Sequence, residues 1–252
     1  MRDDCELPDP VFVMGIPVSP FDSYTHAVGT ISSRIDAGLK TFCVAINPHK
    51  AGKARLDRDL YATLNGADMH ICDGVGIALA ARLLLGKRIS RCTGVQLFFE
   101  LLKEAAQRRW KVFLLGASPE SSELACSNLL RMYPHLRIVD YAHGYFEDSS
   151  TIVTQINESQ ADLLFVAMGS PKQEFWISEN RSRINALFCM GIGGTLDVVS
   201  GKARWAPNWV RRLGLEWAYR TIHRPHRLFP RMVMGVLFAF RTFVQLIIQV
   251  FR

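Results

Sequence analysis

The chain has 252 residues, 49% of them hydrophobic, so it allows one large α/β domain or one domain with an appendage, and its apolar content is ample for a core. A formal net charge of +7 indicates an anionic partner, such as nucleic acid, anionic lipid or a phosphorylated ligand, without bearing on the fold. The acidic start of the chain is not followed by the apolar core of a signal peptide, which argues against secretion.

Strand-like and helical segments alternate along most of the chain. Strands are expected over residues 11–14, 41–46, 69–72, 111–115, 136–140, 162–167 and 186–190. Helices are expected over residues 23–37, 55–64, 77–85, 93–109 and 151–158, from the turn at 116–119 to about 132, and behind Pro171. Several strands are apolar without alternation, which indicates a parallel sheet covered on both faces. The predicted fold class is therefore α/β, with a Rossmann-like parallel sheet.

The six cysteines bear on the compartment. No pair has the C-x-x-C spacing that is typical of zinc and redox sites. Cys43, Cys72 and Cys189 lie within apolar runs, where cysteine behaves as a small core residue. This usage fits a reducing cytosol.

The character of the chain changes near its end, so we expect an α/β domain over residues 1–203 and a basic, amphipathic helical appendage over 204–252. Arginines recur there at three- and four-residue spacing, at positions 220, 224, 227 and 231. From residue 232 the chain is nearly all apolar, with polar residues at 241, 245 and 249 forming one stripe.

This tail is near the length of a membrane span, but an arginine in mid-bilayer costs about 2.5–3.5 kcal/mol even on insertion scales. We therefore expect a helix that lies in the membrane interface, with its apolar face down and arginines on lipid phosphates. The alternative is a terminal helix packed on the domain or on a second subunit. Nucleic acid is not expected, because the apolar face is too wide for a helix that binds a groove.

Asp73 ends the strand at 69–72 and is followed by Gly74, Gly76 and an apolar helix. Ligands of open α/β sheets bind outside the carboxyl ends of strands, so an acid at this point suits a general base. The alternative is that Asp73 only caps the following helix. Arg91 is a nearby cation that could bind a phosphate.

Other motifs carry less chemistry. Asp57 and Asp59 match a D-x-D metal pair, but they fall within a predicted helix, where residues two apart point to different faces. The histidines show no metal-binding spacing, so no metal site is expected. Residues 191–194 resemble half of a dinucleotide fingerprint but follow the last strand, which argues against an oxidoreductase.

One reaction joins a strand-end acid, a cation, loops that suit anions and a membrane-directed tail. It is glycosyl transfer from a nucleotide sugar to a lipid-linked acceptor. The acceptor hydroxyl needs a base, and the departing nucleoside diphosphate needs positive charge.

The chain also carries an ordered set of motifs between about residues 11 and 231. They are Asn47-Pro48, Ala67-Asp68, Asp73-Gly74-Val75-Gly76, Arg91-Cys92-Thr93-Gly94, Gly116-Ala117, Gly144-Tyr145-Phe146, Gly169-Ser170-Pro171-Lys172-Gln173-Glu174, Gly191-Ile192-Gly193-Gly194-Thr195-Leu196-Asp197, Gly201-Lys202, Arg204-Trp205-Ala206-Pro207, Gly214-Leu215-Glu216-Trp217 and Tyr219-Arg220. In this order and spacing, the chain resembles the bacterial WecG/TagA/CpsF glycosyltransferase family.

The resemblance implies transfer, with inversion, of a hexose-type sugar from a UDP-sugar to a polyprenyl-diphosphate-linked saccharide. Such steps build teichoic acid linkage units, enterobacterial common antigen, capsule or exopolysaccharide. The protein would be peripheral or monotopic on the cytoplasmic face of the bacterial inner membrane. No cofactor and no strict metal requirement are expected, and a homo-oligomer is left open.

The resemblance makes Asp73 the base and places Arg91 on a phosphate. Together with the phosphate-binding character of glycine loops at helix starts, it assigns two sets of binding residues. Donor binding falls to Asn47, Gly116, Gly169, Lys172, Gln173, Gly193 and Gly194. Acceptor or phosphate binding falls to Thr93, Arg220 and Arg227.

Three positions depart from the family pattern. Ala45 replaces a common threonine, Gln96 an acid, and Arg224 precedes Pro225 where E-P is common. The donor sugar is therefore left open among N-acetylmannosamine, glucose, a uronic acid and other hexoses. The alternative function is a non-catalytic scaffold that binds nucleotide sugar or lipid in a polysaccharide assembly complex.

Overall fold

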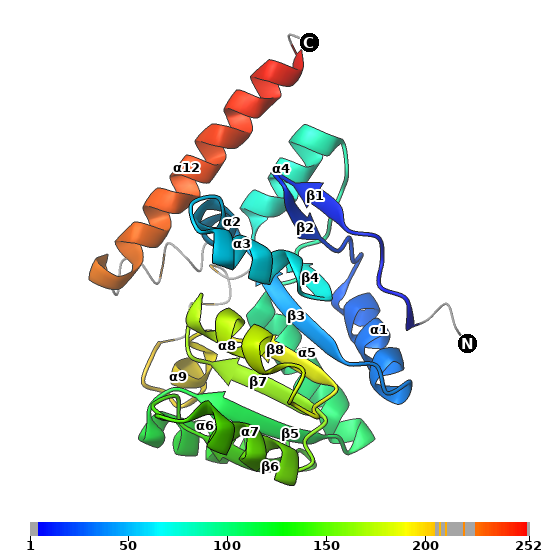
Figure 1. The fold of residues 1–252 in the computed structure, drawn as a ribbon, viewed down its shortest axis with the longest axis vertical. Coiled ribbons are helices and arrows are strands. Elements are labelled where there is room, and N and C mark those ends of the chain that lie inside the picture. Colours follow the sequence, from blue (N-terminus) through cyan, green and yellow to red (C-terminus); the bar gives the residue numbers. More distant parts are fainter. Residues whose placement is uncertain (1–4, 205–206, 208–209, 211–218, 220–224, 251–252) are drawn as a thin grey trace.

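The computed structural model describes residues 5–204, 207, 210, 219 and 225–250 (Figure 1). Its centre is a six-stranded parallel sheet with the strand order β4-β3-β8-β7-β5-β6. The strands are β3 (Thr41–Ile46), β4 (Met69–Cys72), β5 (Lys111–Gly116), β6 (Arg137–Ala142), β7 (Leu163–Ala167) and β8 (Phe188–Gly191). The predicted α/β class with a parallel sheet is thereby confirmed.

Both faces of the sheet are buried, as the strands' continuous apolar runs predict. In β5, Phe113 and Leu115 join one core cluster, and Val112 and Leu114 join the other. One face is covered by α2 (Pro48–Ala54), α3 (Arg58–Asn65), α4 (Val75–Leu85), α7 (Ser149–Glu158) and α8 (Lys172–Asn180). The other is covered by α1 (Tyr24–Asp36), α5 (Gly94–Arg108), α6 (Pro119–Met132) and α9 (Thr195–Val199). Three of the buried cysteines are those predicted to be small core residues.

Two local expectations were wrong. The N-terminal strand is a hairpin of β1 (Val11–Val13) and β2 (Ile16–Val18), because Met14 and Gly15 both adopt positive φ and form a tight two-residue turn. The helix expected at 55–64 starts only at Arg58, because the Asp57 carboxylate accepts a hydrogen bond from the Leu60 N–H and caps it there. Asp57 is therefore a helix cap.

The chain ends in α12 (Pro225–Val250), a 26-residue helix that packs on α2 and α4. Phe238 is buried in the core, and the Thr242 hydroxyl lies 3.3 Å from the Met14 sulfur. A Cβ on Gly52 would lie 3.3 Å from the Met234 carbonyl oxygen, so the two helices meet closely. Helix α12 therefore packs on the α/β domain, which is one of the two arrangements in the alternative to a helix lying only in the membrane interface.

The polar stripe of α12 lies partly toward the domain. Arg241 and Gln245 are half-buried and line a hollow of about 430 Å³ with Met14 and Arg55. A broad apolar face of the helix stays exposed. Within the described ranges, no helix has both the length and the apolar character that a membrane crossing requires.

Candidate functional site

The carboxyl ends of the parallel strands meet at one edge of the sheet, and most of the predicted site residues follow them. Asn47 follows β3, Asp73 follows the neighbouring β4, and Gly193 follows β8 on the other side of β3. This edge is where open α/β sheets bind ligands. The fold thus brings together residues from three separate parts of the chain.

Asp73 does not cap the helix that follows it. The cap position of α4 is Gly74, which makes no side-chain cap hydrogen bond. The Asp73 side chain is instead half-buried, with its Oδ2 3.4 Å from Asn47 Nδ2, and its backbone N–H donates to the Ile46 carbonyl at 2.8 Å. The capping alternative is therefore wrong, and the carboxylate stands beside a neutral donor.

Asn47 uses its amide in two directions. Its oxygen accepts a hydrogen bond from the Lys50 N–H at 2.9 Å and caps α2, which leaves the NH₂ group toward Asp73. The loops fit closely: a Cβ on Gly76 would come within 2.6 Å of Pro48 Cγ. Glycine at this position therefore lets the Asn47-Pro48 turn approach the start of α4.

The segment around Arg91 is held against the end of β4, because the Cys92 N–H donates to the Cys72 carbonyl at 2.9 Å. Burial raises the pKa of the Cys72 thiol to about 12, with Asp73 adding to the rise and Arg91 opposing it. Burial and the Asp73 carboxylate likewise raise the pKa of Cys92 to about 12. The two thiols are therefore neutral neighbours of Asp73, and the half-exposed Arg91 lies in the same electrostatic environment.

Thr93 has a structural role at the start of α5. Its hydroxyl accepts from the Gln96 N–H at 3.3 Å, and its own N–H donates to the Tyr24 hydroxyl at 2.9 Å. The Gln96 side chain in turn donates to Glu100 Oε1 at 2.7 Å. Acceptor binding by Thr93 stays a prediction beside this capping role.

A buried polar network connects α2, α8 and the loop after β8. Gln173 Oε1 accepts from the Gly193 N–H at 2.9 Å, and its Nε2 donates to Glu174 Oε1 at 2.9 Å. The Lys50 ammonium lies 2.8 Å from the same Glu174 oxygen. Because all three side chains are buried, the network holds the Gln173 amide in one orientation.

The charge state of Glu174 follows from this network. Burial alone would raise its pKa, but the Lys50 charge and hydrogen bonds from Lys50, Gln173 and Ser170 hold the pKa below its ordinary value. Sequence reasoning assigned no role to Lys50 or Glu174. The sequence offered no signal for this pair, because the helix that carries Lys50 was not predicted and its partner lies 124 residues away.

At position 116 only a glycine fits, because the backbone has positive φ and the chain at the end of β7 lies close by. Gly116 adopts φ +124°, and a Cβ there would come within 2.5 Å of the Ala167 backbone at the end of β7. Of the other predicted donor-binding residues, Gly169 is half-exposed, whereas Gly194 and Lys172 are exposed. Gly169 and Gly194 stand in the loops after β7 and β8, and Lys172 is the first residue of α8, at the same edge of the sheet.

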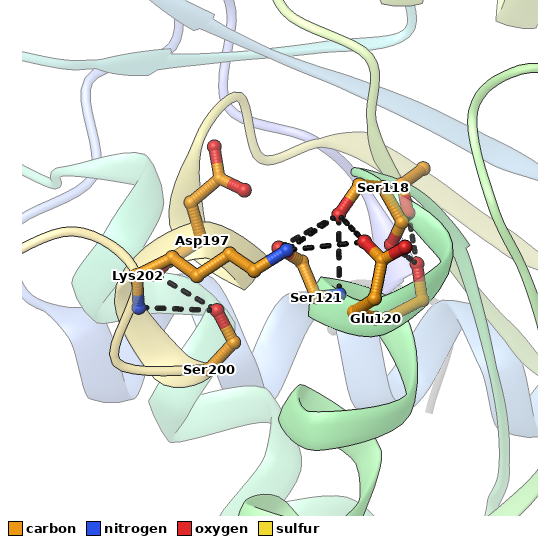
Figure 2. A network of polar contacts seen from close by, with 8 residues as sticks. Ser118, Glu120, Ser121, Asp197, Ser200 and Lys202 are labelled. Carbon is orange, nitrogen blue, oxygen red and sulfur yellow. Dashed lines mark hydrogen bonds and ion pairs between the residues drawn. The ribbon is translucent and has the colours of Figure 1, made fainter.

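In the Gly201-Lys202 motif, the Lys202 side chain contacts residues at the start of α6 (Figure 2). Lys202 Nζ lies 2.9 Å from the Ser118 hydroxyl and 3.1 Å from Glu120 Oε2. Hydrogen bonds from the Ser118 hydroxyl and the Glu120 backbone, together with Lys202, lower the pKa of Glu120 to about 2. The loop after α9 is therefore held next to the loop after β5.

Two predicted residues belong to the appendage. Arg220 lies outside the described residues, and Arg227 falls within α12. Their assignment to the acceptor stays a prediction. Across the described part of the chain, no three His, Cys, Asp or Glu side chains gather in a way that could hold a metal ion.

Comparison with known proteins adds independent information. A model of the glycosyl transferase WecG/TagA/CpsF family matches residues 11–251. The chain is 35% identical over 193 residues to a protein of Bacillus subtilis (strain 168), covering 77% of this chain and 75% of that protein. That protein is named N-acetylglucosaminyldiphosphoundecaprenol N-acetyl-beta-D-mannosaminyltransferase.

Two further relatives carry the same name. The chain is 33% identical over 208 residues to one from Bacillus spizizenii (strain ATCC 23059 / NRRL B-14472 / W23), covering 81% of each protein. It is 35% identical over 182 residues to one from Staphylococcus aureus (strain MRSA252), covering 72% of this chain and 71% of that protein.

Proposed function

Because this chain belongs to the glycosyl transferase WecG/TagA/CpsF family, we propose that it transfers a hexose-type sugar, with inversion, from a UDP-sugar to a polyprenyl-diphosphate-linked saccharide. The predicted enzyme class, a glycosyltransferase, is confirmed by the family match and by the names of the relatives. Those names also support a lipid-diphosphate-linked acceptor and a place in cell-envelope polysaccharide biosynthesis.

The observation that carries the proposal is the Asp73 carboxylate, which ends β4 without capping a helix. In the proposed step, the acceptor hydroxyl oxygen bonds to the anomeric carbon while the bond from that carbon to the diphosphate breaks. The hydroxyl proton passes to Asp73. A single displacement of this kind inverts the anomeric centre.

Asn47 and Arg91 serve this step in different ways. The Asn47 amide, 3.4 Å from Asp73 Oδ2, orients the carboxylate. We place Arg91 on a phosphate of the departing UDP or of the acceptor, where a cation stabilises the charge that develops. Its position beside the end of β4 supports this role.

We propose that the donor binds over the loops after β8 and β7. Support comes from the Gln173 amide, which is held by Glu174 and hydrogen-bonds the Gly193 N–H. We propose that this arrangement fixes the loop after β8 in place beside the UDP diphosphate, and that Lys172 adds positive charge at the rim. We propose that the reaction does not strictly require a metal ion.

We also propose a peripheral position on the cytoplasmic face of the bacterial inner membrane, reached through α12. The exposed apolar face of this helix supports the proposal. A lipid-linked acceptor requires that the enzyme works at the membrane surface. A homo-oligomer stays a prediction.

The proposal is tested by UDP release from a panel of UDP-sugars, with and without a short-chain polyprenyl-diphosphate saccharide. We expect release with one donor and only in the presence of the acceptor, which would also identify the sugar. Binding of UDP without release for any combination of donor and acceptor saccharide would favour the non-catalytic scaffold instead.

A further inference from the structure

Helix α4, which begins two residues after Asp73, is apolar on both sides. Its inner side chains are buried, including Ile77, Ala81 and Leu84. Its outer stripe is formed by Val75, Leu79 and Leu83, which are 47%, 56% and 46% exposed. These residues are spaced by four and therefore lie on one face of the helix. A helix that is hydrophobic all round is normally covered on all sides.

A second exposed apolar face lies on α12, which contacts α4. The exposed apolar side chains of α12 are Val233, Val236, Leu237, Phe240, Phe243, Val244, Ile247 and Ile248. Both helices lie at the end of the molecule away from β6 (Figure 1). A group of this size exceeds the scattered apolar residues of ordinary surfaces and marks a contact site.

The two segments that carry this surface contain basic but no acidic residues. Residues 74–99 contain four Lys or Arg and no Asp or Glu, and residues 225–250, which form α12, contain three Arg and no Asp or Glu. All 23 acidic residues of the chain therefore lie outside these two segments of the sequence. Arg82, Lys87 and Arg88 are exposed on α4 and just after it. Such a surface complements an anionic bilayer, whereas a second copy of the same face would bring like charges together.

We propose that the outer stripe of α4 is a second membrane-contacting element, which enters the boundary between headgroups and acyl chains of an anionic bilayer beside α12. Lys87 and Arg88 contact lipid phosphates at the end of the helix. Because Val75 follows Asp73 by two positions, this contact sets the edge of the sheet that carries Asp73 against the bilayer. The value of this orientation rests on the proposed function, since a lipid-linked acceptor presents its diphosphate there.

The test is co-sedimentation of the full chain with vesicles of phosphatidylglycerol and phosphatidylcholine. The variant carries Leu79→Glu and Leu83→Glu, and the control carries Leu124→Glu at a leucine of α6 that is 44% exposed. We expect the partition coefficient of the variant to fall by about tenfold or more, because two apolar contacts are lost and two charges face anionic lipid. The control should bind like the wild type.

A second variant, Lys87→Gln with Arg88→Gln, should lose about tenfold in binding to anionic vesicles and nothing in binding to pure phosphatidylcholine. Thermal melting and light scattering of each variant check the fold and the mass in solution. Wild-type vesicle binding by the folded leucine variant would overturn the proposal. A loss of self-association without lipid would also overturn it and assign the face to a second copy.

This assay requires no turnover. Vesicle binding lost in the leucine variant, in a protein that releases UDP from no donor, would refute the proposed function and leave this inference standing. UDP release that depends on a soluble acceptor, with vesicle binding unchanged in the leucine variant, would support the proposed function and refute this inference.

Discussion

Asn47 makes hydrogen bonds in two directions, so different substitutions separate its two roles. Asn47→Asp keeps the oxygen that caps α2 but replaces the donor facing Asp73 with a second carboxylate oxygen. We expect helix capping to be retained, whereas UDP release falls about 10- to 100-fold, because like charges repel and Asp73 loses its orienting donor. Steady-state kinetics and thermal melting measure the two effects. Unchanged turnover with unchanged stability would remove Asn47 from the site.

The Lys50–Glu174 pair makes the free energy of unfolding depend on pH. Because the folded-state pKa of Glu174 is lowered, the pair stabilises the fold above the ordinary carboxyl pKa of 4.5, and this contribution is lost as pH falls through the lowered value. Lys50→Met leaves a buried carboxylate without its cation, which costs about 3–5 kcal/mol.

In Lys50→Met, the free energy of unfolding should depend on pH in the opposite direction. Burial now raises the pKa of Glu174, so we expect Lys50→Met to lose further stability as pH rises from 5 to about 8. Denaturant unfolding at both pH values measures this, and the double variant Lys50→Met, Glu174→Met should recover most of the loss. If Lys50→Met were equally stable at both pH values, Glu174 would not depend on Lys50 for its charge.

At the scale of single elements, α12 has two apolar faces with different roles. Phe238 is 4% exposed and packs on the domain, whereas Phe243 is 59% exposed. We expect Phe238→Ala to cost about 3–5 kcal/mol in unfolding free energy, because a buried aromatic ring is removed. Phe243→Ala should leave stability within about 0.5 kcal/mol and lower the share of protein in the membrane fraction. The opposite pattern of results would show that the assignment of the two faces is reversed.

Hydrophobic periodicity predicted the main helices and strands well, because continuous apolar runs and capping residues are local signals. Ser23, Thr93 and Ser118 each cap the helix that the sequence places there. A turn out of the first strand was expected at Gly15, but the second strand of the hairpin was missed, because β2 has only three residues and contains Pro17.

The part of the candidate site that lies at strand ends could also be predicted from the sequence. Asp73 and Asn47 stand at strand ends, and strand ends can be read from the sequence. The Lys50–Glu174–Gln173 network could not be predicted, because its members come together only through the strand order β3-β8-β7, which folding establishes.

At the scale of the whole molecule, the acidic side chains do not gather into a metal site within the described residues. Asp57 caps α3 and Asp59 is exposed in the same helix. We propose that cationic side chains and helix N-termini stabilise the departing diphosphate, and on this proposal we expect UDP release to continue after treatment with a chelator. Loss of turnover on chelation, with rescue by Mg²⁺ or Mn²⁺, would contradict this expectation.

The proposed mechanism depends on the Asp73 carboxylate, which accepts the proton of the acceptor hydroxyl. The most direct measurement is acceptor-dependent UDP release by Asp73→Asn, with Asp59→Asn, an exposed acid of α3, as the matched control. We expect turnover of Asp73→Asn to fall by about 10²–10⁴-fold while the protein still folds and binds UDP, and we expect the control to keep wild-type turnover. Turnover of Asp73→Asn near the wild-type rate would contradict the claim and assign the base to another residue.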